Sequence, residues 1–200
     1  KAALAAADSL RVLIENRDFV ESAEWWHLYN GTWACIGGDD VTVYPVYHAY
    51  RLFHQHFGDK LVNSSVVGSP TFDYVQSPGS VLKSHYGLAY LTSIASSSAD
   101  GKTLYLMVVN KDRTTPREAM VNISNFLPTG ASQIDVETWE LNGPDVDDYT
   151  NVQNVGITTS TTTRDASFSY VFPAHSVTSF KIEQTPVEAS IVDVKKLADG

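Results

Sequence analysis

The sequence predicts a mostly β protein: an antiparallel β-sandwich preceded by a helix–strand–helix unit. Residues 60–183 are short apolar or alternating runs separated by turn residues every 8–12 positions or so, which is typical of all-β domains. The first 58 residues instead carry two helical periodicities around an aromatic-rich segment, a typical unit of an α/β fold with parallel strands. We therefore expect one unit at 1–59, a β-sandwich at 60–184, and a tail of unknown role at 185–200.

Two helices and one strand account for the N-terminal unit. The run from Ala2 to Asn16 places apolar residues along one helical stripe, and residues 18–27 are expected to form a strand. The second helix begins at Pro45, which suits a first helical position, and Gly58 stands where a left-handed C-terminal cap is expected. The stripe of the first helix consists of Ala3, Ala6, Leu10, Leu13 and Ile14.

The second unit divides into about eight strands. Asp100-Gly101, between two apolar runs, is a strong hairpin signal because both central residues tolerate positive φ. The Thr-rich stretch 158–163 favours an exposed strand rather than a linker. The expected strands lie near 61–67, 71–75, 88–95, 103–109, 118–123, 133–141, 157–163 with 167–172 as a hairpin, and 177–182.

Composition excludes several classes of protein. The net charge is −9, with 14 Lys and Arg against 23 Asp and Glu, so the basic surface of a nucleic-acid binder is missing. Apolar stretches reach about ten residues, half of what a membrane-spanning helix needs, so we expect no membrane partner. The one cysteine, Cys35, permits neither an intrachain disulfide nor a Cys-based zinc site. Because the chain starts inside a predicted helix, we also expect part of a parent protein to be missing.

The order of several motifs resembles one enzyme family. The sequence is similar, over residues 2–183, to the end of the catalytic barrel and the C-terminal β-domain of glycoside hydrolase family 51 α-L-arabinofuranosidases. The motifs that carry this resemblance are the Ala-rich first helix, Asp18-Phe-Val-Glu-Ser-Ala-Glu-Trp-Trp-His-Leu-Tyr-Asn30, Tyr44-Pro-Val-Tyr-His-Ala-Tyr-Arg-Leu-Phe53, Gly58-Asp59, Leu106-Met-Val-Val-Asn-Lys111, Val136-Glu-Thr-Trp-Glu-Leu-Asn-Gly-Pro144 and Phe172-Pro-Ala-His-Ser-Val-Thr-Ser-Phe180.

The resemblance implies a role for each of the two predicted units. Residues 1–59 would be the last helix–strand–helix unit of a (β/α)8 barrel, and the sandwich would be the accessory domain. Retaining enzymes of this plan use two carboxylates about 5–5.5 Å apart. In the family both carboxylates precede the segment that this chain resembles. We therefore assign no catalytic residue, expect the chain alone to be inactive, and expect its partners to be the upstream catalytic portion and an arabinose-containing polysaccharide or oligosaccharide.

Trp25, Trp26, His27 and Asn30 are the candidate sugar contacts. Aromatic faces stack on sugar rings, and His and Asn side chains fix hydroxyl groups, although large aromatics are also the usual core residues and packing is the alternative. In the family a Gln is common at the position of His27 and an Asn matches Asn30, so His27 departs from the family pattern. Glu21 and Glu24 are excluded as a catalytic pair, because residues three apart on a strand point to opposite faces.

No cofactor or metal is predicted. His54 and His56 stand two apart and do not share a helix face, and no third ligand is visible. His48 and His175 are expected to be structural for the same reason. The Asp-rich segment 145–148 lacks the glycine and distal glutamate of an EF-hand loop, so we expect a solvated loop there.

Secretion is the expected localisation. Asn30, Asn63 and Asn122 each fit the acceptor pattern for N-glycosylation, and Ser and Thr are abundant. A polysaccharide substrate, which is met outside the cell, favours the same localisation.

Two rival interpretations stay open at this point. The first is a non-catalytic carbohydrate-binding module. Trp139 argues against this interpretation, because it alternates with apolar neighbours as a core residue would. The second is a structural fragment of a parent enzyme nicked by a protease, which would stay associated with the larger catalytic piece.

Overall fold

Two helices occupy the N-terminal part of the chain. The computed structural model describes residues 1–24, 28–29, 34–39, 42–127, 133–147 and 154–184. Helices α1 (Ala2–Glu15) and α2 (Pro45–Gln55) lie where the periodicity predicts them. Of the strand expected at 18–27, residues 18–24 form no strand, and 25–27 lie outside the described residues. A strand needs a neighbour to pair its backbone groups, and none of the described strands pairs with 18–24.

All ten described strands pair in an antiparallel manner, as expected. Six form one sheet in the order β1-β4-β5-β10-β7-β8, while β2 pairs with β3 and β6 pairs with β9 in separate two-stranded sheets. The strands are β1 (Lys60–Val62), β2 (Thr71–Tyr74), β3 (His85–Ala89), β4 (Leu91–Ser97), β5 (Thr103–Asn110), β6 (Arg117–Asn122), β7 (Gln133–Asn142), β8 (Gly156–Asp165), β9 (Ser167–Phe172) and β10 (Val177–Gln184).

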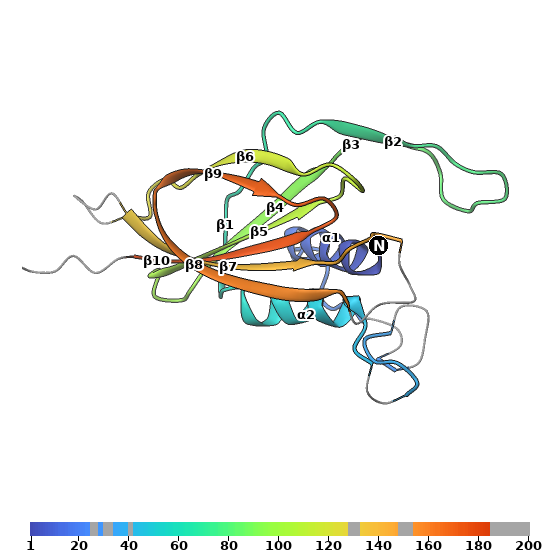
Figure 1. The fold of residues 1–200 in the computed structure, drawn as a ribbon, viewed down its shortest axis with the longest axis horizontal. Helices are drawn as coiled ribbons and strands as arrows, with labels where there is room; N and C mark the ends of the chain where they lie inside the picture. The colour runs from blue at the N-terminus through green and yellow to red at the C-terminus, as the bar shows by residue number, and fades with distance from the viewer. Residues whose placement is uncertain (25–27, 30–33, 40–41, 128–132, 148–153, 185–200) are drawn as a thin grey trace, which may run out of the picture.

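The central strands of the six-stranded sheet are buried on both faces. Helices α1 and α2 cover one face and the β6–β9 pair covers the other (Figure 1). Alternation along each strand supplies both cores: in β5, Met107 and Val109 pack toward the helices, whereas Val108 packs under β6 and β9. The mostly β, sandwich-type architecture expected from the sequence is therefore confirmed, and β8 is an exposed strand as its Thr-rich sequence predicts.

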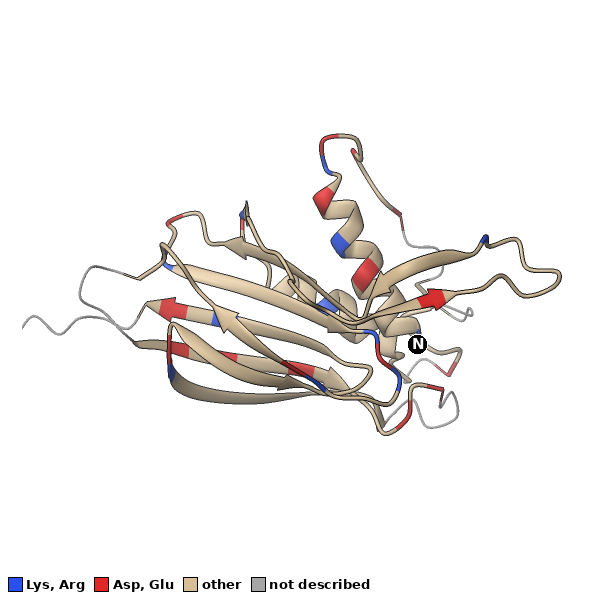
Figure 2. Ribbon diagram, turned by 90° about the horizontal axis from the view of Figure 1, so that it is seen from above, with Lys and Arg blue, Asp and Glu red and all other residues tan. Residues whose placement is uncertain are grey.

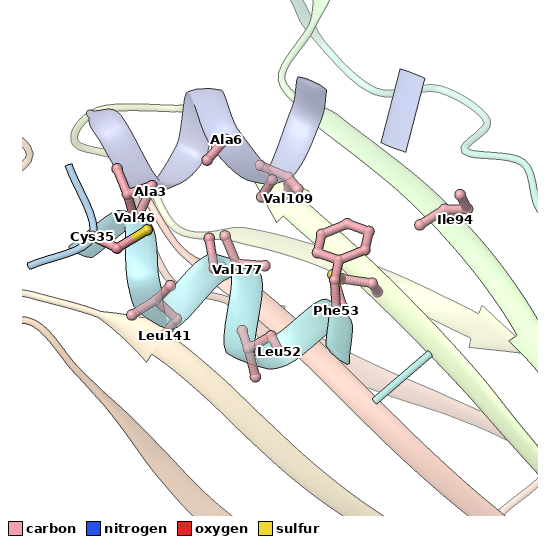
Figure 3. Packing of buried hydrophobic residues seen from close by; sticks show 13 residues of the cluster. Ala3, Ala6, Cys35, Val46, Leu52, Phe53, Ile94, Val109, Leu141 and Val177 are labelled. Atoms are coloured by element: carbon pink, nitrogen blue, oxygen red, sulfur yellow. The ribbon is translucent and has the colours of Figure 1, made fainter. Parts of the chain in front are cut away.

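The helix-side core joins the two predicted units. Small residues of α1, such as Ala6, and larger ones of α2, such as Leu52, pack on Ile94, Val109 and other side chains of the sheet (Figure 3). The boundary at residues 59 and 60 stays a prediction, but side-chain packing across it is continuous. The expected tail, 185–200, lies outside the described residues.

Gly58 has a different role from the one predicted. The C-cap residue of α2 is His56, and the φ of Gly58 is not in the left-handed region. A Cβ at Gly58 would instead lie 2.3 Å from the carbonyl oxygen of Ser97 in β4. Glycine is needed here because the chain leaving α2 passes directly against the sheet.

Candidate functional site

The predicted sugar contacts, Trp25, Trp26, His27 and Asn30, lie outside the described residues. The neighbouring Leu28 is described, and it is anchored by its carbonyl oxygen, which accepts hydrogen bonds from the backbone N–H groups of Cys35 (3.1 Å) and Ile36 (3.0 Å). Tyr44, the N-cap residue of α2, donates its N–H to the carbonyl of Cys35 at 2.9 Å. Leu28, the residue after His27, is thereby connected through Cys35 to the start of α2.

The side chains beside the candidate segment face solvent. Leu28 is 69% exposed and Tyr29 is 47% exposed, and the Tyr29 hydroxyl donates to the carbonyl of Gly38 at 3.0 Å. Glu21 and Glu24 are both exposed, so neither lies in the enclosed environment that shifts the pKa of a catalytic carboxylate.

A second feature is an open groove of about 700 Å³ along the outer side of α1. Its charged groups are paired: Lys111 bonds Asp8 (3.2 Å), and both Lys1 and Arg113 pair with Asp147. The remaining wall is largely aliphatic, formed mainly by Leu4, Val12, Leu13 and Val146. A groove with satisfied charges and an apolar floor suits a protein surface better than an ionic substrate.

The polar network around Asp8 was not evident from the sequence. Helical spacing places Asp8 on the polar side of α1, but its carboxylate also accepts from Thr92 Oγ1 (2.9 Å) in β4 and from Arg11 (2.7 Å). Burial would raise the pKa of Asp8, but the hydrogen bond from Arg11 and the charge of Lys111 outweigh it, and the pKa lies below its usual value. No sequence signal marks contacts so distant along the chain.

A hydrogen-bond network around Asn110 and Asp112 lies at one end of the sheet. The amide of Asn110 donates to the carbonyls of Phe172 (3.1 Å) and Pro173 (2.8 Å), and Asp112 accepts from the backbone N–H groups of Thr114 and Thr115. The contacts of Asn110 join two motifs that carry the family resemblance, 106–111 and 172–180, and they are structural.

His175 is held between two backbone carbonyl groups, as expected of a structural histidine. The ring nitrogens of His175 lie 2.8 Å from the carbonyl oxygen of Arg113 and 2.9 Å from that of Gly143. His54 is exposed while His56 is buried, so the two do not face one ligand. Burial lowers the pKa of His56 and of His48. Within the described ranges no three His, Cys, Asp or Glu side chains are grouped to hold a metal ion.

Trp139 packs between the sheet and α2. Its ring centroid lies 4.2 Å from that of His56, the Arg51 guanidinium lies 5.9 Å from the same ring, and the indole N–H donates to Glu137 at 2.9 Å. The prediction that Trp139 is a packing residue is confirmed. It is not part of an exposed aromatic row.

Two of the three glycosylation candidates are described. Asn63 is exposed just after β1. Asn122 is exposed in β6, and its side-chain oxygen accepts from Ser167 Oγ at 2.5 Å. Asn30 lies outside the described residues, and glycosylation of all three stays a prediction.

Neither described helix combines the length and apolarity that a membrane crossing requires.

Comparison with known proteins identifies the architecture. No protein-family model matches the sequence, and no curated protein does. Among solved structures, an α-L-arabinofuranosidase from Thermotoga maritima, in an arabinose complex, matches with a TM-score of 0.78 and 29% identity over 90% of this chain. The resemblance to family 51 arabinofuranosidases is confirmed.

Further structures agree with this result. A family 51 α-L-arabinofuranosidase from Thermotoga petrophila matches with a TM-score of 0.75 and 28% identity, over 90% of this chain and 38% of its own. A family 44 xyloglucanase from Paenibacillus polymyxa, at 18% identity and a TM-score of 0.58 over 91% of this chain and 29% of its own, shares the fold alone. The chain also spans 38% of the length of the Thermotoga maritima enzyme, as a C-terminal part would.

Proposed function

We propose that this chain is the C-terminal portion of a retaining glycoside hydrolase, an α-L-arabinofuranosidase that releases arabinofuranosyl groups from hemicellulose. The observation that carries the proposal is the match to the Thermotoga maritima enzyme, at 29% identity over 90% of this chain. Both catalytic carboxylates belong to an upstream portion, and this chain completes the barrel with α1 and α2 and supports it with the β-sandwich.

The packing of the helices supports this role. Helix α2 is fixed to the sheet by Leu52, which is fully buried, and by the contact of His56 with Trp139. Helix α1 buries Ala3, Ala6 and Ala7 against the same core and leaves its outer groove for the upstream portion. Both helices pack on the sheet through one core, which would fix their position beside a barrel.

Sugar contact is assigned to Trp25, Trp26, His27 and Asn30. Leu28, which stands between His27 and Asn30 in the sequence, is tied to the start of α2 through the backbone groups of Cys35 and Tyr44. Aromatic rings beside hydrogen-bonding side chains suit the apolar face and hydroxyl rim of a sugar.

Hydrolysis of an aryl α-L-arabinofuranoside tests the function. The longer polypeptide that ends in this chain should hydrolyse it with retention of configuration, and this chain alone should show no turnover above background. Turnover by this chain alone would refute the upstream placement of the carboxylates, and an inactive longer polypeptide with a normal melting curve would refute the substrate class.

Variants of the longer enzyme test the sugar contacts. His27→Ala should raise KM, whereas His27→Gln, which installs the residue common in the family, should preserve activity. Val171→Ser, at an exposed position on β9, is the control and should change neither kcat nor KM. Equal kinetics for His27→Ala and the control would remove His27 from the site.

The rival assignment, a free carbohydrate-binding module, is weakened by Trp139. Its ring is covered by His56 and Arg51, so it offers no open face for a sugar.

We also propose that the enzyme is secreted and glycosylated at Asn63 and Asn122, where the side chains reach solvent. Loss of mass on treatment of the natural protein with an N-glycan-removing enzyme tests this.

A further inference from the structure

The β2–β3 pair forms an arm that projects from the body of the protein. Its strands pair with each other and with no other strand of the described chain (Figure 1). The arm is nearly free of charge, in contrast to the acidic body (Figure 2), since Asp73 and Lys83 are its only acidic and basic residues between 63 and 90. An isolated two-stranded ribbon is marginally stable in water, so an arm of this kind needs a covering surface.

The tip of the arm is ordered by its own hydrogen bonds. The side-chain amide of Gln76 donates to the carbonyl of Ser80 at 2.7 Å, and the backbone N–H of Gln76 donates to Ser84 Oγ at 2.9 Å. Between these ties Val81 is 95% exposed and Leu82 is 63% exposed. The tip therefore presents two aliphatic side chains on a pre-shaped loop, which lowers the entropy cost of binding.

The root of the arm is tied to helix α1. Tyr90, at the end of β3, donates its N–H to Pro70 (3.0 Å) and accepts from the N–H of Lys111 (2.8 Å), and the ammonium of Lys111 bonds Asp8 of α1 (3.2 Å). The guanidinium of Arg117 lies 4.7 Å from the centre of the Tyr90 ring. Lys111 also lines the groove on α1, so it connects the root of the arm to one wall of that groove.

We propose that the arm and the α1 groove together clasp the upstream catalytic portion, with Val81 and Leu82 packed on an apolar patch of that portion. This inference rests on the proposed function. The solved structures that this chain resembles are more than twice as long as the part it matches, so they include the chain that would fill the clasp. An uncharged, aliphatic tip fits an apolar surface, and its connection to the groove favours the neighbour of α1 over a second copy of this chain.

The test compares the melting temperature of the longer polypeptide with that of its Val81→Ser/Leu82→Ser variant. We expect a fall of about 3–6 °C, the effect of withdrawing two buried aliphatic side chains, together with faster release of this portion by a protease. The matched control is Val171→Ser, an exposed valine on β9 at the opposite face of the sheet from α1, which should leave both readouts unchanged. Neither substitution should alter the melting of this chain alone.

Three outcomes would overturn the clasp. The double variant could melt like the control in the longer polypeptide. The chain alone could sediment as a dimer that the double variant abolishes, which would make a second copy the occupant. The natural product could contain no upstream portion at all. Since the readout is stability, a clasp that fails in an active arabinofuranosidase is distinguishable from failure of the proposed function.

Discussion

Gly58→Ala should be one of the most damaging single-methyl additions in this chain. Gly58 joins α2 to β1, and a Cβ there would lie 2.3 Å from the carbonyl oxygen and 2.5 Å from the carbonyl carbon of Ser97. Both atoms belong to the backbone of β4, which cannot move aside without disturbing the pairing of Lys60 with Ser97. The added methyl group therefore has to displace either α2 or the edge of the sheet.

The expected cost follows from two contributions. Forcing a methyl group into a packed site costs about 1–3 kcal/mol. The displacement would also break the hydrogen bond from the Gly58 N–H to Ser96 Oγ, now 2.7 Å long, at about 1 kcal/mol. Together these predict a loss of about 2–4 kcal/mol in the free energy of unfolding, which a urea titration followed by circular dichroism would show as a midpoint lowered by roughly 1–2 M.

Gly156→Ala is the matched control. A Cβ at Gly156, in β8, would meet nothing within 4 Å, and φ there is outside the left-handed region. The substitution should therefore be neutral or stabilise the protein by up to about 1 kcal/mol through the unfolded state. Equal midpoints for the two variants would show that α2 does not approach β4 as closely as described, and would refute the reasoning.

Three further predictions concern the packing and the buried ionisable groups. Trp139→Ala should lower the unfolding free energy by about 3 kcal/mol, and Trp139→Phe by less; unchanged melting with lost sugar binding would contradict the packing role. Burial lowers the pKa of His48 and His56, so the stability that these neutral side chains contribute is full above the usual pKa of 6.5 and should fall as the pH drops below it. Replacing both with Phe should flatten the plot of unfolding free energy against pH between pH 7 and pH 5. A plot as steep as that of the unsubstituted protein would contradict this prediction. Asp112→Ala should cost about 3–5 kcal/mol because it strips Arg117 of its carboxylate partner, while Asp112→Asn should cost less; equal melting of the two variants would show that the backbone contacts of Asp112 do not matter.

The strands could be predicted because their signals are local. Turn residues and alternation predict a strand at 133–141, and β7 spans Gln133–Asn142. The split between β3 and β4 could not be predicted, because residues 88–91, Leu-Ala-Tyr-Leu, are apolar without a turn residue among them. The break falls at Tyr90, where the chain changes its pairing partner: the N–H of Tyr90 bonds Pro70, just before β2, and its carbonyl accepts from Lys111, just after β5.

Tertiary contacts set the limit of prediction elsewhere. Asp8 reads as a solvated helix residue, yet its partners Thr92 and Lys111 lie 84 and 103 residues further along the chain. Gly58 reads as a helix cap, and only the path of β4 reveals that it is a point of close approach. The candidate sugar contacts at 25–27 and 30 depend on a resemblance and on residue chemistry, and they stay predictions.

In our proposal this chain works as the C-terminal part of a longer arabinofuranosidase. The mass of the natural protein, measured under native and then denaturing conditions, tests this most directly. We predict that the 22.0 kDa sequence is found within, or tightly bound to, a particle at least twice its mass that hydrolyses arabinofuranosides. A lone, folded, monodisperse species of 22.0 kDa with no larger partner would contradict the account.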